Sequence, residues 1–316
     1  MSQTSAEALT SSWYPTREEL LLRPLRTGVF AFDPENPVEI DDAPHVEEVG
    51  RNDYYVEVHI ADGGLLRGTD VVKAARQQGW SEYNPDGTHR LMLPRGITQM
   101  LDLDKKTAVG APAITVSFGV SKASSGKIIV SDVDLEQTRI MCEGRTYDQF
   151  RTMCKEGDPQ AMLLVRAAKL LLWHSGRQYF SRIHFGSDVI AQYMKTVNAG
   201  VAKKFKDGPY LFRNQSEEAL AQWKDPEERE FFRRMNIAFY NGQALGHDSM
   251  QLSGYCHFSS PLRRFPDLAN HINLRDISEG REPTYSAADI DEIAREMTLI
   301  FMRRSSYFRK LKKAAA

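Results

Sequence analysis

The chain has 316 residues, of which 41% are hydrophobic and 26% are charged, which is the composition of a globular protein and excludes a disordered, collagenous or coiled-coil chain. Its 41 Lys and Arg residues nearly balance 42 Asp and Glu residues, so no general electrostatic attraction to nucleic acid is expected, and no DNA partner. No run of about 18 apolar residues occurs, and no basic start followed by an apolar run opens the chain, so we expect neither a membrane partner nor secretion.

The cysteines indicate the redox compartment. Cys142, Cys154 and Cys256 are odd in number and lie in no CxxC or Cys/His zinc spacing. They therefore predict free thiols or small buried side chains, and a cytoplasmic location.

The first half of the chain is predicted to hold the strands. Residues 1–27 are polar and end in a Leu-rich stretch closed by Pro24, which predicts an N-terminal arm. A helix is predicted over residues 68–79, with Gly79 as its stop. Short apolar or alternating runs, separated by Gly, Pro, Asn and Asp, predict strands over residues 29–33, 54–62, 90–94, 113–121 and 127–135.

The second half is predicted to be helical. Apolar residues recur at helical spacing over residues 158–178, 187–206, 226–241 and 286–311. Strands first and helices later predict an α+β fold, in which helices pack on a mixed or antiparallel sheet. No long linker interrupts residues 28–316, so we predict one domain that ends in a basic helix. The sequence does not predict the oligomeric state.

The densest acidic segment follows the first predicted strand and contains Asp33, Glu35, Glu39, Asp41 and Asp42. Carboxylates beside apolar residues repel one another and resist desolvation unless a cation neutralises them. Oxygen ligands without His or Cys suit Mg²⁺, or alternatively Mn²⁺. The spacing alone leaves an acidic surface loop open as the alternative.

A second candidate site lies in residues 255–271, YCHFSSPLRRFPDLANH. Arg263 and Arg264 follow a Ser-Ser-Pro turn, the kind of helix start at which guanidinium groups hold a phosphate. The alternative is a helix start whose arginines pair with Asp267 or with the acidic segment.

Taken in order, these motifs resemble the catalytic domain of the ribonuclease II and ribonuclease R family, the RNB domain. Residues 33–43 resemble the family's opening pattern, an Asp, then five residues, then Asp-x-Asp-Asp-Ala, and residues 255–271 are similar to its YTHFTSPIRRYPDLLVH signature. Further similar segments lie between them, in matching order, at residues 58–62, 76–79, 83–85, 92–94, 145–150, 189–205 and 210–214.

The resemblance implies a metal-dependent 3′→5′ exoribonuclease, a hydrolase that degrades single-stranded RNA or RNA 3′ ends to nucleoside 5′-monophosphates. Residues 28–316 would be its catalytic domain. Asp33, Asp41 and Asp42 would be catalytic carboxylates that also bind Mg²⁺ or Mn²⁺, and Glu39 stands at the position of the remaining metal-binding acid.

The resemblance also assigns contacts with the RNA. Arg263 would be the catalytic arginine that grips the scissile phosphate, and its neighbour Arg264 would contact the substrate backbone or the acids. Tyr83 would stack on the 3′-terminal base. The expected partner is single-stranded RNA or a tRNA 3′ end.

Two departures from the family pattern leave alternatives open. Glu39 is one methylene longer than the Asp of the family, which predicts weakened activity. The residues outside the motifs also leave no room for the flanking OB-fold RNA-binding domains of larger members, so we expect a compact member. The alternatives are a protein redirected to an aminoacyl- or peptidyl-tRNA 3′ end, and a catalytically weak pseudo-enzyme that binds RNA or protein.

Overall fold

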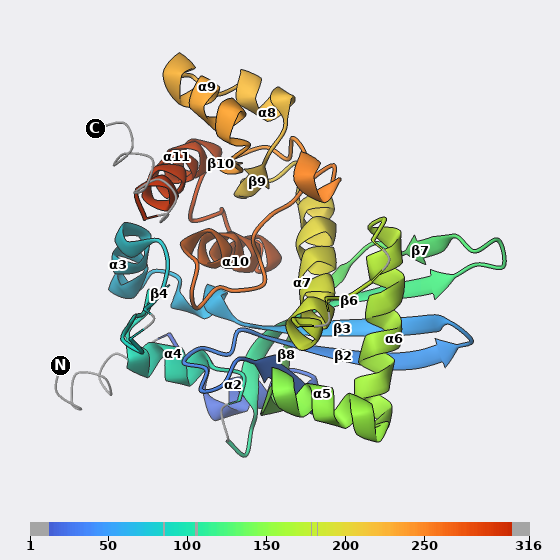
Figure 1. Cartoon of the computed structure of the whole chain (residues 1–316). Helices are drawn as coiled ribbons and strands as arrows, with labels where there is room; N and C mark the ends of the chain where they lie inside the picture. Colours follow the sequence, from blue (N-terminus) through green and yellow to red (C-terminus); the bar gives the residue numbers. More distant parts are fainter. Residues whose placement is uncertain (1–12, 85, 105–106, 178, 182, 305–316) are drawn as a thin grey trace.

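The computed structural model describes residues 13–84, 86–104, 107–177, 179–181 and 183–304 (Figure 1). Its centre is one mixed sheet with the strand order β1-β8-β6-β3-β2, and β7 pairs with β6 beside this path. Only β1 and β8 pair in parallel among these neighbours. The strands are β1 (Leu25–Asp33), β2 (Asp42–Gly50), β3 (Asp53–Ala61), β6 (Ala111–Lys122), β7 (Ile128–Val130) and β8 (Asp134–Thr146).

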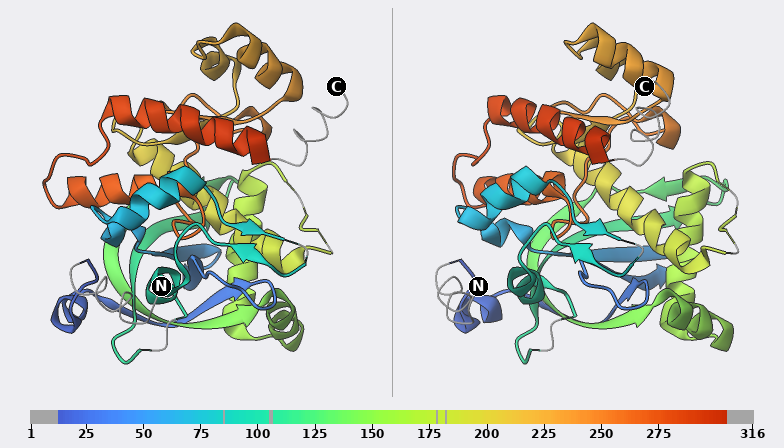
Figure 2. Two further views of the ribbon diagram at one scale, coloured as in Figure 1. Left: turned by 90° about the vertical axis from the view of Figure 1, so that its left-hand side faces the viewer. Right: turned by 60° about the vertical axis from the view of Figure 1, so that its left-hand side comes forward.

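The sheet curls until its two edge strands come close to each other (Figure 2). Gln160 bridges these edges, because its Nε2 donates to the carbonyl of Gly28 in β1 at 2.6 Å and lies 3.3 Å from Nδ1 of His45 in β2. The strand directions bring the C-terminal ends of β1, β3 and β8 together with the N-terminal ends of β2 and β6. Both ends of the acidic segment therefore lie at one end of the sheet.

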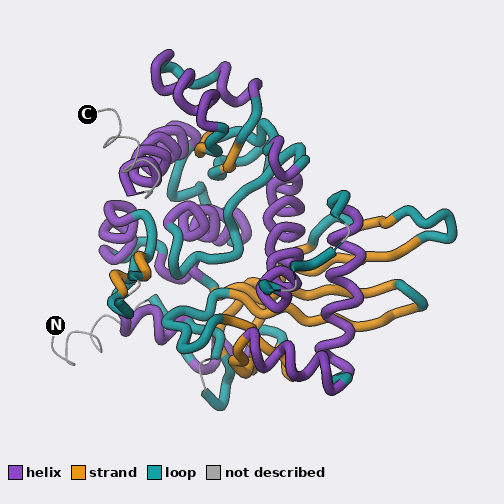
Figure 3. Tube along the Cα trace, viewed as in Figure 1, coloured by secondary structure: helices purple, strands orange, loops and turns teal. Residues whose placement is uncertain are grey.

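Helices cover the two faces of the sheet and flank its curled end (Figures 1 and 3). One group packs with the aromatic core of the sheet and comprises α5 (Tyr147–Glu156), α6 (Pro159–His174) and α7 (Phe185–Lys204). The other group comprises α3 (Asp70–Gln78), α4 (Arg95–Leu101), α10 (Phe265–Ser278) and α11 (Ala287–Arg304).

Smaller elements complete the described chain. They are α2 (Arg17–Leu22), η1 (Gly63–Leu66), β4 (Glu82–Tyr83), β5 (His89–Arg90), β9 (Phe212–Asn214), α8 (Glu217–Ala221), α9 (Pro226–Met235), β10 (Phe239–Asn241) and η2 (Asp248–Met250). Strands β4 and β5 form a separate two-stranded ribbon, and so do β9 and β10.

Two hydrophobic clusters hold these layers together. Phe32, Phe118 and Phe150 are almost fully buried in the cluster under α5, α6 and α7. Phe265 and Leu268 of α10 anchor the other cluster. Neighbouring residues of β1 alternate between the clusters, since Ala31 belongs to one and Phe32 to the other, as the period of a strand requires.

Local sequence signals explain where the helices begin. The Asp158 side chain accepts a hydrogen bond from the amide of Ala161 at the start of α6, and Pro159 occupies its first turn. Thr146 and Gln149 form a capping box at α5.

The mixed sheet with packed helices confirms the predicted α+β fold. The strands predicted over 29–33, 54–62 and 113–121 are confirmed as parts of β1, β3 and β6. Strand β2 was not predicted, because it contains Pro44 and exposed acidic residues. It lies at the sheet edge, where these residues are tolerated.

Two strand predictions were wrong in detail. Over residues 90–94 only Arg90 belongs to a strand, because Met92 and Leu93 are buried in the turn that leads into α4. The run 127–135 is divided between β7 and β8, with residues 131–133 outside both strands.

The helix predicted over 68–79 is confirmed as α3, and those over 158–178 and 187–206 are confirmed as α6 and α7. The prediction over 226–241 extends too far, because α9 ends at Met235 and residues 239–241 form β10. The basic C-terminal helix is described as α11 to Arg304, and residues 305–316 lie outside the described residues.

The predicted N-terminal arm overlaps the sheet. Residues 1–12 lie outside the described residues, α2 spans Arg17–Leu22, and β1 begins at Leu25, ahead of the expected boundary at residue 27. Leu25 and Arg26 pair with β8. The division into an arm and one domain stays a prediction.

Two glycines let η1 approach α10 closely. A Cβ atom at Gly64 would lie 2.7 Å from the carbonyl oxygen of His271, and one at Gly63 would lie 2.7 Å from the Cβ of Pro261. This contact holds residues 261–264 against the end of β3, where the acidic segment lies.

We therefore expect Gly64→Ala to lower the free energy of unfolding by about 1–3 kcal/mol, because the backbone carbonyl of α10 must move to admit a methyl group. Urea unfolding followed by circular dichroism measures the change. Gly96→Ala is the matched control, since a Cβ atom at Gly96 meets nothing within 4 Å. Equal stability of the two variants would contradict the close approach.

Candidate active site

Arg263 lies between two acidic residues that belong to the junction of β1 and β2. Its Nε is 3.1 Å from Oδ2 of Asp41, and its Nη2 is 3.6 Å from Oδ2 of Asp42. Nη2 also donates a hydrogen bond to Oγ of Ser260 at 3.1 Å. Residues separated by more than two hundred positions in the chain thus form one charged cluster.

Asp41 connects three segments at this point. Its Oδ1 accepts a hydrogen bond from the amide of Leu262 at 2.7 Å, and its backbone carbonyl accepts one from the amide of Ala61 at 2.8 Å. Its buried Oδ2 faces Arg263 without the alignment of a hydrogen bond and has no hydrogen-bond partner in the described part of the chain. One buried carboxylate oxygen therefore remains available to a further cation.

The carboxylate of Glu39 points to the β4–β5 ribbon. Its Oε1 accepts a hydrogen bond from Oγ of Ser81 at 3.0 Å, and its Oε2 accepts one from the hydroxyl of Tyr83. Ser81 also donates its amide to the carbonyl of Arg263 at 2.9 Å. Both oxygens of Glu39 are thus engaged, while 47% of the Tyr83 surface stays exposed.

Burial and mutual repulsion raise the pKa of the carboxyl groups. Burial first, then the charges of Asp42 and Asp102, raise the pKa of Asp33 to about 7, although Arg263 opposes the change. Burial also raises the pKa of Asp41 well above its ordinary value, and Arg263 again opposes it. One guanidinium does not neutralise the cluster.

Three features near the acids were not identified as site residues from the sequence. Ser81 joins Glu39 to the Arg263 backbone. Asp102, whose pKa burial raises to about 6, contributes to the repulsion at Asp33. Burial first, then Asp33 and Asp42, raise the pKa of Tyr147, which places its phenol near the acids. The DLD sequence at 102–104 is the one signal that could have indicated Asp102.

Arg264 is engaged away from the acids. Its Nε and Nη2 donate to the two carboxylate oxygens of buried Asp267 at 2.8 and 2.6 Å. Both pairings that the sequence left open are therefore present, Arg264 with Asp267 and Arg263 with the acidic segment. A contact of Arg264 with substrate stays a prediction.

The described residues contain no group of three or more His, Cys, Asp or Glu arranged to hold a metal ion. The chemistry of the donors nevertheless fits a hard cation, because Asp41 has an unpartnered buried oxygen and Asp33 and Asp42 repel each other. Binding of Mg²⁺ or Mn²⁺ by Asp33, Asp41, Asp42 and Glu39 stays a prediction.

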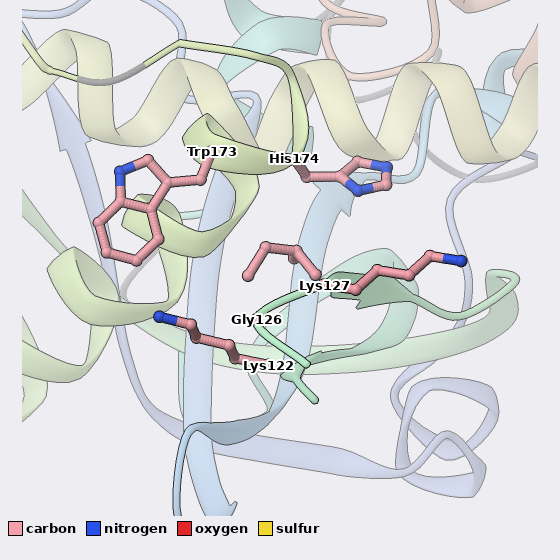
Figure 4. A pocket seen from close by; sticks show the side chains of 6 residues that line it. Lys122, Gly126, Lys127, Trp173 and His174 are labelled. Carbon is pink, nitrogen blue, oxygen red and sulfur yellow. The ribbon is translucent and has the colours of Figure 1, made fainter. Parts of the chain in front are cut away.

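A cleft of about 480 Å³ lies elsewhere, among Lys122, Lys127, Trp173 and His174 (Figure 4). Lys122 and Ala113 lie toward the two opposite ends of β6, and Ala113 pairs with Ala61 beside the acids. The nine-residue separation along the strand is roughly 30 Å. No carboxylate lines this cleft, so it is separate from the acidic site.

Comparison with known proteins finds similarity to ribonucleases. The RNB domain model matches residues 166–280. The mitochondrial exoribonuclease II of Saccharomyces cerevisiae is 23% identical, over 84% of this chain and 35% of its own length. This chain spans between 35% and 50% of the length of the first three curated relatives that it matches.

Solved structures share the fold. The apo form of Mycoplasma genitalium RNase R superposes with a TM-score of 0.75 at 17% identity, covering 98% of this chain and 61% of that one. The same protein has been solved with double-stranded RNA. Yeast Ssd1, a pseudonuclease, has a TM-score of 0.67 at 17% identity, over 90% of this chain and 44% of its own.

The match of the RNB domain model to part of the chain, residues 166–280, and the curated relatives named as ribonucleases make this chain similar to ribonuclease II and ribonuclease R. The solved structures show that it shares their fold. None of the described helices is long and apolar enough to cross a bilayer.

The protonation of Asp33 predicts how the metal-free stability depends on pH. Its pKa is raised from 3.8 to about 7 on folding, so the folded state binds the extra proton. The stabilisation of the folded state by this proton is complete below about pH 4 and is lost as the pH rises through 7. We expect Asp33→Asn to raise the free energy of unfolding at pH 8 in EDTA on the order of 2–4 kcal/mol.

Urea unfolding at pH 5 and pH 8 checks this expectation, and the gain from Asp33→Asn should be larger at pH 8. Asp207→Asn, an exposed carboxyl outside the cluster, is the control and should be neutral at both values. A gain from Asp33→Asn that does not depend on pH would show that the proton is held elsewhere.

Proposed function

We propose that this chain is a 3′→5′ exoribonuclease that hydrolyses single-stranded RNA, or RNA 3′ ends, to nucleoside 5′-monophosphates. One observation carries the proposal, namely that Arg263 is held against Asp41 and Asp42 beside the exposed ring of Tyr83. A guanidinium for phosphate, carboxylates for hydrolysis and an aromatic ring for a base thus occur together.

Arg263 supplies the phosphate-binding group in this proposal. Its side chain is 34% exposed, so the planar fork can present donors to a phosphate while Nε stays beside Asp41. Charge that develops on the phosphate oxygens during hydrolysis is stabilised by a donor already fixed in place. The hydrogen bond to Ser260 fixes the orientation of the fork.

The carboxylates of Asp33, Asp41 and Asp42 would hold Mg²⁺ or Mn²⁺, which when bound supplies Lewis-acid stabilisation and lowers the pKa of water. Burial first, then the charge of Asp42, raises the pKa of Asp33 to about 7, so its carboxyl can gain or release a proton near neutral pH. Asp41 keeps its position through the Leu262 amide, so its free oxygen is oriented before substrate arrives.

A pseudonuclease that binds RNA without cleavage is the second candidate. Its support is that Ssd1 shares the fold and that the acids of the described chain form no metal-holding group. Redirection to an aminoacyl- or peptidyl-tRNA 3′ end is the remaining alternative, and the same cleavage assay with charged tRNA distinguishes it.

Asp41→Asn tests the carboxylate chemistry. The amide oxygen can still accept from Leu262, so fold and RNA binding should persist, while cleavage of 5′-labelled RNA should fall by at least about a hundredfold because the charge is lost. Reactions with Mg²⁺, Mn²⁺ or EDTA are separated on a denaturing gel, and the wild-type protein should not cleave RNA in EDTA.

Asp207→Asn is the control for that assay and should cleave at the wild-type rate. Full activity of Asp41→Asn would place the chemistry on other residues. An inactive wild type that binds RNA in every buffer would favour the pseudonuclease.

Arg263→Lys tests the guanidinium. Lysine keeps the positive charge beside Asp41 but lacks the planar fork, so we expect kcat to fall about 10²- to 10³-fold with the acids still partly neutralised. Single-turnover cleavage separates this loss from weaker RNA binding. An unchanged rate would mean that charge alone suffices at this position.

A further inference from the structure

We propose that Glu39 is a positioning residue, which fixes the Tyr83 ring as a platform for the 3′-terminal base of the RNA. The inference rests on the proposed function and assigns Glu39 a task other than metal binding. Its carboxylate is buried, and each oxygen accepts a hydrogen bond from the segment that carries the ring, one from Ser81 and one from Tyr83.

The segment needs such an anchor because it is short. Strands β4 and β5 contain two residues each, and an isolated two-stranded ribbon is marginally stable in water. The Tyr83 ring meets His89 edge to face at a centroid distance of 5.5 Å, while its hydroxyl end reaches the buried carboxylate. The ring is therefore anchored at its hydroxyl end, while 47% of the residue's surface stays exposed.

Glu39 also connects the ring to Arg263. The hydroxyl of Ser81 donates to Glu39 and accepts the amide of Met92 at 2.8 Å, while the Ser81 amide donates to the Arg263 carbonyl at 2.9 Å. One carboxylate therefore sets the position of the base platform relative to the phosphate-binding side chain.

The length of Glu39 matters for this task. An Asp side chain would withdraw the carboxylate by about one carbon–carbon bond, roughly 1.5 Å, which exceeds the tolerance of a hydrogen bond. If Glu39 is a metal ligand, Glu39→Asp should restore metal binding. If it positions Tyr83, Glu39→Asp should release the ring.

The experiment measures RNA binding by fluorescence anisotropy in EDTA, because without divalent metal ions a metal-ligand role of Glu39 cannot affect binding. Two oligoribonucleotides are compared, identical except that one ends in an abasic 3′ ribose. We expect wild type to bind the normal end about 5- to 150-fold more tightly, the range of one base–aromatic stack. Glu39→Asp, Glu39→Ala and Tyr83→Phe should each reduce this preference to less than about threefold, because each breaks the same hydrogen bond.

Glu39→Ala combined with Tyr83→Phe should lose no more than either single change, since both act on one contact. Thr88→Ala is the control, because Thr88 lies on the turn of the same ribbon and bonds exposed Asp86 and Asn84. It should keep the wild-type preference. Tyr83→Phe leaves the buried carboxylate in place and carries the test alone if the Glu39 variants do not fold.

Titration with Mn²⁺, followed by electron paramagnetic resonance without RNA, provides the second measurement. Glu39→Ala should keep the wild-type Mn²⁺ affinity within about twofold, whereas loss of even a residue that supports a metal ligand typically costs about tenfold or more. Lost Mn²⁺ affinity with an intact base preference would overturn the inference. If the wild-type protein binds the normal and the abasic oligoribonucleotides equally, the role of Glu39 is overturned and the proposed function is not. If it binds neither oligoribonucleotide, the proposed function is overturned as well.

Discussion

The buried contact between Asp41 and Arg263 is the interaction on which the site depends. Burial raises the pKa of Asp41 well above its ordinary value, and the guanidinium at 3.1 Å and the Leu262 amide at 2.7 Å favour its charged form. Removing one partner of such a pair leaves an uncompensated buried charge. The pair therefore fixes the segment before α10 against the β1–β2 junction, and the close approach of η1 to α10 makes this contact sterically feasible.

The curled sheet explains why the acids come from one short segment. β1 and β2 follow each other in the chain but stand at the two edges of the sheet. They come close to each other only because the sheet curls, and Gln160 bridges them. Asp33 ends one edge and Asp42 begins the other. Asp33 and Asp42 are only nine positions apart in the sequence, and both therefore lie at the same end of the sheet. Arg263, from a distant part of the chain, contacts the acids there.

The sequence predicted the charged core of this site better than its surroundings. Asp33, Asp41, Asp42 and Arg263 follow from an acidic run, an arginine pair and their resemblance to a family. The partner of Glu39 could not be predicted, because it depends on how a two-residue strand folds back from position 83. β2 was missed for a related reason, since edge strands carry Pro and exposed acids that local patterns exclude.

Charge balance then determines what the site can accept. The described cluster joins one guanidinium with several carboxyl groups, and Asp33 relieves the excess by keeping a proton up to about pH 7. In the proposed reaction, an RNA phosphate would add negative charge to the same place and compete for Arg263. Binding such a phosphate with Asp33 ionised would therefore require additional positive charge, because repulsion among the acids already exceeds what Arg263 neutralises. In the proposed ribonuclease, the acids would thus couple phosphate binding, protonation and cation binding in one site.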